Sequence, residues 1–249
     1  MEVQLLRHAT LIVTLNKKKV LVDPMLGGKG VMPPIQNSPT LQRNPLVELR
    51  IPLNFQNIDG ILLTHTHHDH FDETAIEKLP KDKPIICQPE DEDNLQRLGF
   101  LKVYSVTDEL YWQGITINRT SGQHGTGEIA KKMAPVSGYV LQTEGEPSLY
   151  IAGDTIYCEE VASTLLKYQP NVIIVNAGGA RFITGDPITM SEQDVVNVCR
   201  QAQKSKVIAV HMEAINHCLV SRKALYMCLE QERLVDQVFI PMDGEKIIL

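Results

Sequence analysis

The sequence predicts an α/β protein, more specifically a four-layer αββα sandwich in which two packed β-sheets lie between outer helices. Two groups of short apolar runs of strand length support this prediction, and helical patterns accompany each group. Helices and sheets both have an apolar face to bury, so alternating them in this way favours helices on the outer faces of paired sheets. With 249 residues, of which 43% are hydrophobic, the chain is long enough for one domain over residues 1–249.

The N-terminal group begins as a meander of short strands. β-type runs cover residues 2–6, 11–15 and 19–23, and the polar residues 16–18 join the last two runs as a hairpin turn. Nine prolines and glycines then break every regular pattern over residues 24–57. An irregular stretch of this length is typical of a lid or a pocket wall inserted in the domain, and packing filler is the alternative.

The rest of the chain alternates strands with helices. An apolar run over residues 58–63 ends at a histidine cluster, and Asp72 caps a helix that reaches about residue 79. Further strands are expected at 84–87, 101–106, 115–119, 137–143, 148–152, 171–176, 206–211, 237–240 and 246–249. Further helices are expected at 91–98, 159–168, 191–203 and 221–233. The histidine cluster therefore sits at a strand-to-helix turn.

Composition argues against several classes of protein. The formal net charge of −6 argues against an extended nucleic acid as partner, because such binding needs clustered Lys and Arg. The five cysteines are scattered without a Cys-x-x-Cys pair, which argues against a disulfide framework and a thiolate zinc site. Without a signal-like start or a membrane-spanning apolar run, we expect a soluble, cytoplasmic protein with no membrane partner. Its oligomeric state is open, and a homo-oligomer fits.

A dense group of metal-binding residue types follows the run at 58–63, with the sequence His65-Thr66-His67-His68-Asp69-His70. Residues two apart on an extended chain project to the same side, so His65 and His67 can share one ion. Asp69 and His70 come where the chain turns into the helix, and they can reach a second ion nearby. Imidazole and carboxylate donors suit zinc, our first expectation, and also manganese, iron or nickel.

Three more candidate ligands follow later strands. His124 is flanked by glycines that let the backbone approach an ion closely. Asp154 follows an apolar run, and its carboxylate has two oxygens with which to bridge two cations. His211 ends the run at 206–211. Taken singly, each of these residues is more often a loop or core residue, so their value lies in combination with the cluster.

In this order the motifs resemble the metallo-β-lactamase fold superfamily. The pattern is His-x-His-x-Asp-His after an apolar strand, a lone His before Gly, Gly-Asp-Thr, and a His ending a late strand, over roughly residues 2–240. The resemblance implies the αββα sandwich and two divalent metal ions. It also implies the ligands: His65, His67 and His124 on one ion, Asp69, His70 and His211 on the other, and Asp154 bridging both.

Shorter motifs resemble one branch of that superfamily, the branch related to ascorbate-6-phosphate lactonase. They are Arg7-His8-Ala9-Thr10, Leu21-Val22-Asp23-Pro24 and the segment 210–217. This narrower resemblance is a hint toward lactones or phosphate esters. His67 stands where the di-iron oxygen-reducing relatives carry Glu, which favours hydrolysis over redox chemistry.

The resemblance implies a metal-dependent hydrolase in which a metal-bridged hydroxide attacks a small-molecule substrate. We expect that substrate to be anionic: an ester, a lactone or a phosphodiester. Bound divalent ions would supply the local positive charge that the composition lacks. The alternatives are a non-catalytic metal-binding or regulatory protein of the same fold, and a nuclease acting on short oligonucleotides.

Several further residues are candidates for supporting roles. Asp69 is expected to hydrogen-bond the hydroxide as well as bind metal. Asp23 and Asp59 are candidates to orient metal-bound imidazoles. Candidates to donate a proton or bind substrate are His8, Tyr157, Glu213 and His217. We expect His68 to point away and anchor the loop, and Arg43, Arg50 and Arg181 to clamp an anionic group or simply lie on the surface.

Overall fold

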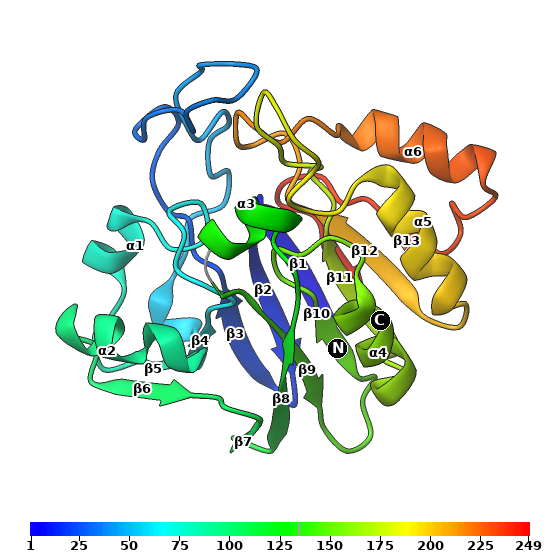
Figure 1. The fold of residues 1–249 in the computed structure, drawn as a ribbon. Helices are drawn as coiled ribbons and strands as arrows, with labels where there is room; N and C mark the ends of the chain where they lie inside the picture. Colours follow the sequence, from blue (N-terminus) through cyan, green and yellow to red (C-terminus); the bar gives the residue numbers. More distant parts are fainter. Residues whose placement is uncertain (134) are drawn as a thin grey trace.

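Two β-sheets form the centre of the protein, which a computed structural model describes over residues 1–133 and 135–249 (Figure 1). The first sheet has the strand order β14 (Lys246–Ile248), β1 (Glu2–Arg7), β2 (Thr10–Leu15), β3 (Lys18–Val22), β4 (Gly60–Leu62), β5 (Pro84–Cys87), β6 (Lys102–Ser105). The second has the order β13 (Val238–Phe239), β12 (Lys206–Val210), β11 (Val172–Asn176), β10 (Leu149–Ile151), β9 (Ser137–Gln142), β8 (Ile115–Ser121), β7 (Glu109–Trp112).

Helices cover the outer face of each sheet, as Figure 1 shows. The helices are α1 (Glu73–Lys78), α2 (Pro89–Arg97), α3 (Gly127–Lys132), α4 (Glu159–Tyr168), α5 (Glu192–Gln201) and α6 (Arg222–Gln231). One apolar cluster fills the space between the sheets, a second packs α1 and α2 against the first sheet, and a third packs α4, α5 and α6 against the second. The predicted four-layer αββα sandwich is therefore confirmed.

The strands run so that many carboxyl ends meet at one edge of the molecule. β3, β4, β5 and β6 pair in parallel, and so do β10, β11, β12 and β13. The β1–β2 turn lies at this same edge, because Leu11 pairs with Val22 at the end of β3. Polar residues placed directly after these strands are thus brought together from distant parts of the sequence.

One strand and one α-helix escaped the sequence analysis, and both lack the pattern that would have indicated them. β7 is a four-residue edge strand that pairs with β8, and it is largely exposed. α3 is a six-residue helix with no buried residue and no side-chain cap, so it has no apolar face that a helical period would reveal. None of the helices among the described residues has the length and apolar composition needed to cross a lipid bilayer.

The irregular segment 24–57 contains a short 3-10 helix (Phe55–Asn57) and is fastened to the sheets by buried polar contacts. At its start, the fully buried Arg7 guanidinium donates to the carbonyls of Met25 and Gly27, at 2.6 and 2.9 Å. Each of these bonds satisfies a backbone oxygen in a part of the segment that belongs to no helix or strand. Residues 31–35 line a cavity, so this part of the insertion forms a pocket wall.

Asn216, in the loop after β12, fastens the middle of this segment. Its side chain accepts from the amide of Ile35 at 3.0 Å and from Asn44 Nδ2 at 2.8 Å, and it donates to the carbonyl of Thr40 at 2.6 Å. Its own amide donates to Asn44 Oδ1 at 2.9 Å. Asn216 and Asn44 are both buried, so the hydrogen bonds between them are shielded from replacement water.

We expect Asn216→Ala to lower the free energy of unfolding by roughly 3 kcal/mol, because it leaves several buried polar groups without partners. Urea unfolding followed by circular dichroism measures this difference. Asn94→Ala, at an exposed position of α2, is the matched control and should change stability by less than about 0.5 kcal/mol. Equal stability of the two variants would show that Asn216 does not fasten the segment.

Candidate metal centre

The seven residues proposed from the sequence as ligands gather at the edge where the carboxyl ends of the strands meet. The cluster from His65 to His70 follows β4, and His124 follows β8. Asp154 follows β10, and His211 follows β12. Apart from the partly buried His67, all of these side chains are buried. Residues up to 146 positions apart in the sequence thus form one compact group.

Asp154 lies at the centre of the group. Its Oδ2 atom is 3.3 Å from His70 Nε2, 3.5 Å from His124 Nε2 and 3.9 Å from His65 Nε2. Its Oδ1 atom is 3.3 Å from His211 Nε2 and accepts from Asn176 Nδ2 at 2.7 Å. One carboxylate therefore faces four imidazoles, with its two oxygens directed to different members of the group.

The donor atoms fall into overlapping sets of a size that suits single metal ions. His65, His67 and His124 form one set, whose donor atoms all lie within 4.8 Å of one another. Asp69, His70 and His211 lie in a second set, which is completed by His8. These sets correspond to the two ligand groups that the sequence resemblance implied.

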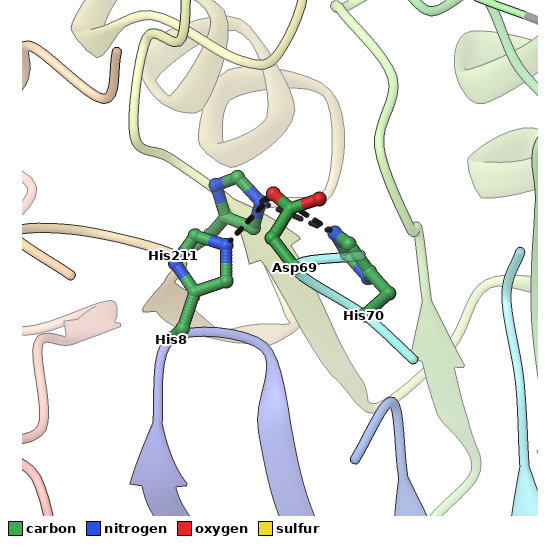
Figure 2. A group of neighbouring side chains, drawn as sticks. All are labelled: His8, Asp69, His70 and His211. Atoms are coloured by element: carbon green, nitrogen blue, oxygen red, sulfur yellow. Dashed lines mark hydrogen bonds and ion pairs between the residues drawn. The ribbon is translucent and has the colours of Figure 1, made fainter. Parts of the chain in front are cut away.

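His8 joins the group from the β1–β2 turn, and Figure 2 shows it with Asp69, His70 and His211 around the Asp69 carboxylate. His8 Nε2 lies 3.2 Å from Asp69 Oδ2, and the ring centroids of His8 and His211 are 3.6 Å apart. His211 Nε2 is 3.6 Å from the same Asp69 oxygen. From the sequence, His8 was a candidate to donate a proton or bind substrate beside the cluster. In the structure it is fully buried and is itself a member of the cluster.

Each of four histidines has its second ring nitrogen held by another group, which leaves the Nε2 atom directed into the cluster. His70 Nδ1 contacts Asp23 Oδ2 at 2.9 Å, and His65 Nδ1 contacts Thr64 Oγ1 at 3.0 Å. The other two contacts are His124 Nδ1 to the Ile188 carbonyl at 2.7 Å and His211 Nδ1 to Cys218 Sγ at 3.5 Å. Metal-binding histidines are commonly oriented in this way.

Asp23 occupies the position that the sequence suggested, whereas Asp59 does not. Asp23 also accepts from the amide and hydroxyl of Thr64, at 2.8 and 2.7 Å, and so connects β3 to the start of the cluster. Asp59 accepts from the amide of Lys19 and pairs with Lys18. The prediction for Asp59 is wrong because this residue precedes β4, while the cluster follows the opposite end of the strand.

The other supporting candidates are divided between the site and the surface. His217 is buried and lines the cavity above the cluster. His68 also lines this cavity and is exposed, so the prediction that it turns away as a loop anchor is wrong. Tyr157 donates to Gln201, and Glu213 pairs with Arg222. Neither of these contacts is with a residue of the cluster. Closeness in sequence to a ligand therefore did not place either side chain at the site.

The charges of the cluster explain what it can hold. Burial favours the neutral acids, but the surrounding imidazoles outweigh it and hold the pKa values of Asp69 and Asp154 well below their usual range. Burial lowers the pKa of His65 well below its usual value and that of His8 to about 3. These histidines are therefore neutral at pH 7 and have lone pairs to donate.

His70 differs from the other histidines. Burial disfavours its charged form, but Asp154 and Asp23 outweigh burial and raise the pKa of His70 well above its usual value. The buried carboxylates thus favour a positive charge at this point. Neutral imidazoles and ionised carboxylates without a thiolate in the set are suitable ligands for divalent zinc, manganese, iron or nickel. The residues present fit a metal centre.

Several residues of the site have backbone conformations that L-amino acids seldom adopt. The φ angles are 60° at His8, 42° at Asp23 and 69° at His211. Such left-handed conformations cost free energy at non-glycine residues, and they tend to collect at functional sites. Here they turn the chain sharply after β1, β3 and β12, directly where the side chains must point into the cluster.

A cavity of about 250 Å³ opens above the cluster. His67, Asp69, His124 and Asp154 form its floor, and Ile35, Met133 and Phe182 contribute apolar walls. No Lys or Arg is found among the described residues that line it. Arg43, one of the proposed clamps, donates instead to the carbonyls of Gly30 and Val31 at the surface. Arg50 and Arg181 are also exposed.

Comparison with known proteins decides the family. Residues 18–212 match the beta-lactamase superfamily domain. The chain belongs to this superfamily. It is 34% identical to the UPF0173 protein YddR of Bacillus subtilis (strain 168), over 98% of each chain. It is therefore a member of the UPF0173 family of metal-dependent hydrolases.

Two solved structures share the whole fold of this beta-lactamase superfamily member. One is described as a possible metal-dependent hydrolase from Veillonella parvula, with 33% identity, a TM-score of 0.95, and coverage of 100% of this chain and 99% of that chain. The other is an isothiocyanate hydrolase from Delia radicum gut bacteria, with 32% identity, a TM-score of 0.94 and the same coverage. The superfamily resemblance is confirmed, and the narrower one to ascorbate-6-phosphate lactonase stays a prediction.

Asp23 and Asp59 provide a direct test of the site. We expect Asp23→Ala to weaken metal binding about 10- to 100-fold, because His70 loses the carboxylate that orients it. Asp59→Ala should bind metal as the unchanged protein does. Competition with a chromogenic chelator measures both affinities, and circular dichroism confirms folding. If both variants bind equally, Asp23 does not orient the site; the milder Asp23→Asn repeats the test should Asp23→Ala fail to fold.

Proposed function

We propose that the protein is a hydrolase with a dinuclear metal centre held by the seven residues His65, His67, Asp69, His70, His124, Asp154 and His211. The two separate donor sets, each within 4.8 Å, support two ions, and a third set of His65, His70 and Asp154 joins them, which supports a role for Asp154 as a carboxylate that would bridge the ions. Zinc is the first choice, and manganese, iron or nickel suit the same donors.

Two bound divalent ions would lower the pKa of a water held between them from about 15.7 toward neutrality, and so would supply a metal-bridged hydroxide at physiological pH. The protein itself contributes a fixed acceptor for the proton of such a water. Asp69 is ionised, and His8 holds one of its oxygens at 3.2 Å. His217 faces the same cavity from the opposite loop and is the remaining candidate to hydrogen-bond substrate.

We further propose that the substrate is a small uncharged electrophile, namely an isothiocyanate. The observation that supports this choice best is the cavity lining, which has apolar walls and no Lys or Arg among its described residues. A basic side chain is the usual means of holding a carboxylate or phosphate. Similarity over the whole chain to a protein described as an isothiocyanate hydrolase agrees with the choice. The anionic ester, lactone or phosphodiester expected from the sequence finds no such clamp.

The proposed reaction adds one water to R–N=C=S. The water oxygen bonds to the central carbon, the electron pair of the C–N π bond moves to nitrogen, and nitrogen takes a proton, which gives an N-substituted thiocarbamic acid. The remaining C–N bond then breaks as nitrogen takes the acid proton. The products are the amine R–NH₂ and carbonyl sulfide. The active site does not need to exclude bulk water completely for this reaction, because water is itself the co-substrate.

Metal removal tests the proposal. We expect two metal equivalents per chain by elemental analysis, and loss of benzyl isothiocyanate turnover by on the order of 1,000-fold after chelation, because the nucleophile is no longer acidified. Added zinc or manganese should restore turnover, which is measured as amine release. Full turnover by the metal-free protein would overturn the proposal. Binding of two ions without turnover would favour a regulatory protein, and cleavage of short oligonucleotides would favour a nuclease.

A further inference from the structure

A second cavity of about 330 Å³ adjoins the one above the metal centre. The two cavities share the lining residues Ile35, His68 and Asp69. The first holds the donor atoms of the cluster, and the second extends sideways between the segment 24–57 and the start of α1. A ligand whose reacting group lies over the cluster can therefore place a substituent in the second cavity.

We propose that the second cavity is the subsite for the substituent of the substrate, and that it selects apolar or positively charged substituents against carboxylated ones. This inference rests on the proposed hydrolysis of isothiocyanates, whose reacting group is the same in every member and whose substituent alone distinguishes them. Selectivity among such substrates must come from the part of the site that the substituent occupies.

The side of the subsite formed by the insertion is apolar except for Asn44, whose side chain is engaged by Asn216. Val31, Pro33, Pro34 and Ile35 line it from the segment 24–57, and Ile215 lines it from the loop after β12. Prolines have no amide hydrogen to leave unsatisfied, so this wall presents little polar backbone to a ligand. An apolar substituent that leaves water for this wall gains roughly 25 cal/mol for each Å² it buries.

The wall is held in place at the residue where the cavities meet. Asn216 accepts from the Ile35 amide at 3.0 Å and donates to the Ile35 carbonyl at 3.2 Å. Both backbone polar groups of Ile35 are thus fixed by one buried side chain. Binding at a wall already fixed in this way costs less ordering of the protein, and it makes the shape of the junction between the cavities selective.

The opposite side of the subsite is acidic. Asp72 and Glu73, at the start of α1, line it together with Asp69. The Asp72 carboxylate is engaged by the amides of Gly27 and Ala75, at 2.6 and 2.8 Å. Glu73 is exposed, and no ion pair with it is found among the described residues. Because the described lining also lacks Lys and Arg, a carboxylate placed beside Asp72 and Glu73, away from the metal centre, meets their negative charge and finds no basic side chain to pair with.

Isothiocyanates that differ in the size and charge of the substituent test this selectivity with the metal-loaded protein. The series is methyl isothiocyanate, benzyl isothiocyanate, and benzyl isothiocyanates that carry in the para position either a carboxylate or a quaternary ammonium group. We expect kcat/KM for the carboxylated compound to be at least about 10-fold below that for the benzyl compound, and the ammonium compound to match or exceed the benzyl compound.

Charge reversal at Glu73 identifies the residue responsible. We expect Glu73→Lys to reduce the discrimination against the carboxylated compound, measured as its kcat/KM relative to that of the benzyl compound, about 10-fold. Glu77→Lys is the matched control, since Glu77 lies exposed on the same helix outside the cavity. Because Ile35 lines both cavities, Ile35→Ala should lower kcat/KM for both compounds, and the loss should be about 10-fold greater for the benzyl compound than for methyl isothiocyanate.

The outcomes separate the subsite from the proposed function. Hydrolysis of all four compounds with equal kcat/KM, or identical behaviour of Glu73→Lys and Glu77→Lys, would overturn the subsite while leaving the hydrolase standing. Failure of the metal-loaded protein to hydrolyse any of the four would overturn the proposed substrate class, and the subsite with it. An equal loss of kcat/KM for methyl and benzyl isothiocyanate in Ile35→Ala would show that Ile35 does not contact the substituent.

Discussion

The structure depends on a concentration of buried negative charge that the protein alone neutralises only in part, through His70. Asp23, Asp69 and Asp154 are all buried at one edge of the sandwich, and the described residues bring no Lys or Arg within ion-pair distance of them. Isolated buried carboxylates are costly unless they are paired or bind a cation. The cluster therefore favours divalent metal ions, and metal binding in turn contributes to the stability of the fold.

One loop connects this charge requirement to the shape of the cavities. Within eight residues after β12 lie a cluster histidine, His211, and an apolar lining residue, Ile215. Asn216 and His217 follow, the first fastening the pocket wall and the second facing the cavity. Cys218 then returns to contact the second nitrogen of His211 at 3.5 Å. The metal centre and the pocket wall consequently share one short segment, so a shift in one is transmitted to the other.

The sequence predicted the fold and the cluster well because both leave local signals. Apolar runs of strand length mark β4 and β12, and the histidines that follow them stand out by type and spacing. The signal fails where only three-dimensional contact decides a role. Asp59 and Asp23 look alike in sequence, yet one precedes its strand and the other follows it. Asn216 and Thr64 were likewise missed, because nothing in the residue type of either one indicates its contacts in the folded chain. For Thr64 there was one available signal, since it directly precedes the cluster, and this position suggests a supporting role.

The same reasoning explains why the expected anionic substrate had little support from the structure. The expectation of an anionic substrate rested on the net charge of the chain and on the expected metal ions. Both are compatible with an anion that binds directly to the ions. Preference for an anionic substituent needs a basic side chain beyond the ions, and the position of each arginine is set by tertiary contacts. Arg43 is used by the carbonyls of Gly30 and Val31, on the outer side of the pocket wall. In the proposed function, the fold would provide a general means of activating water, while the insertion at 24–57 and the start of α1 would determine which molecules reach it.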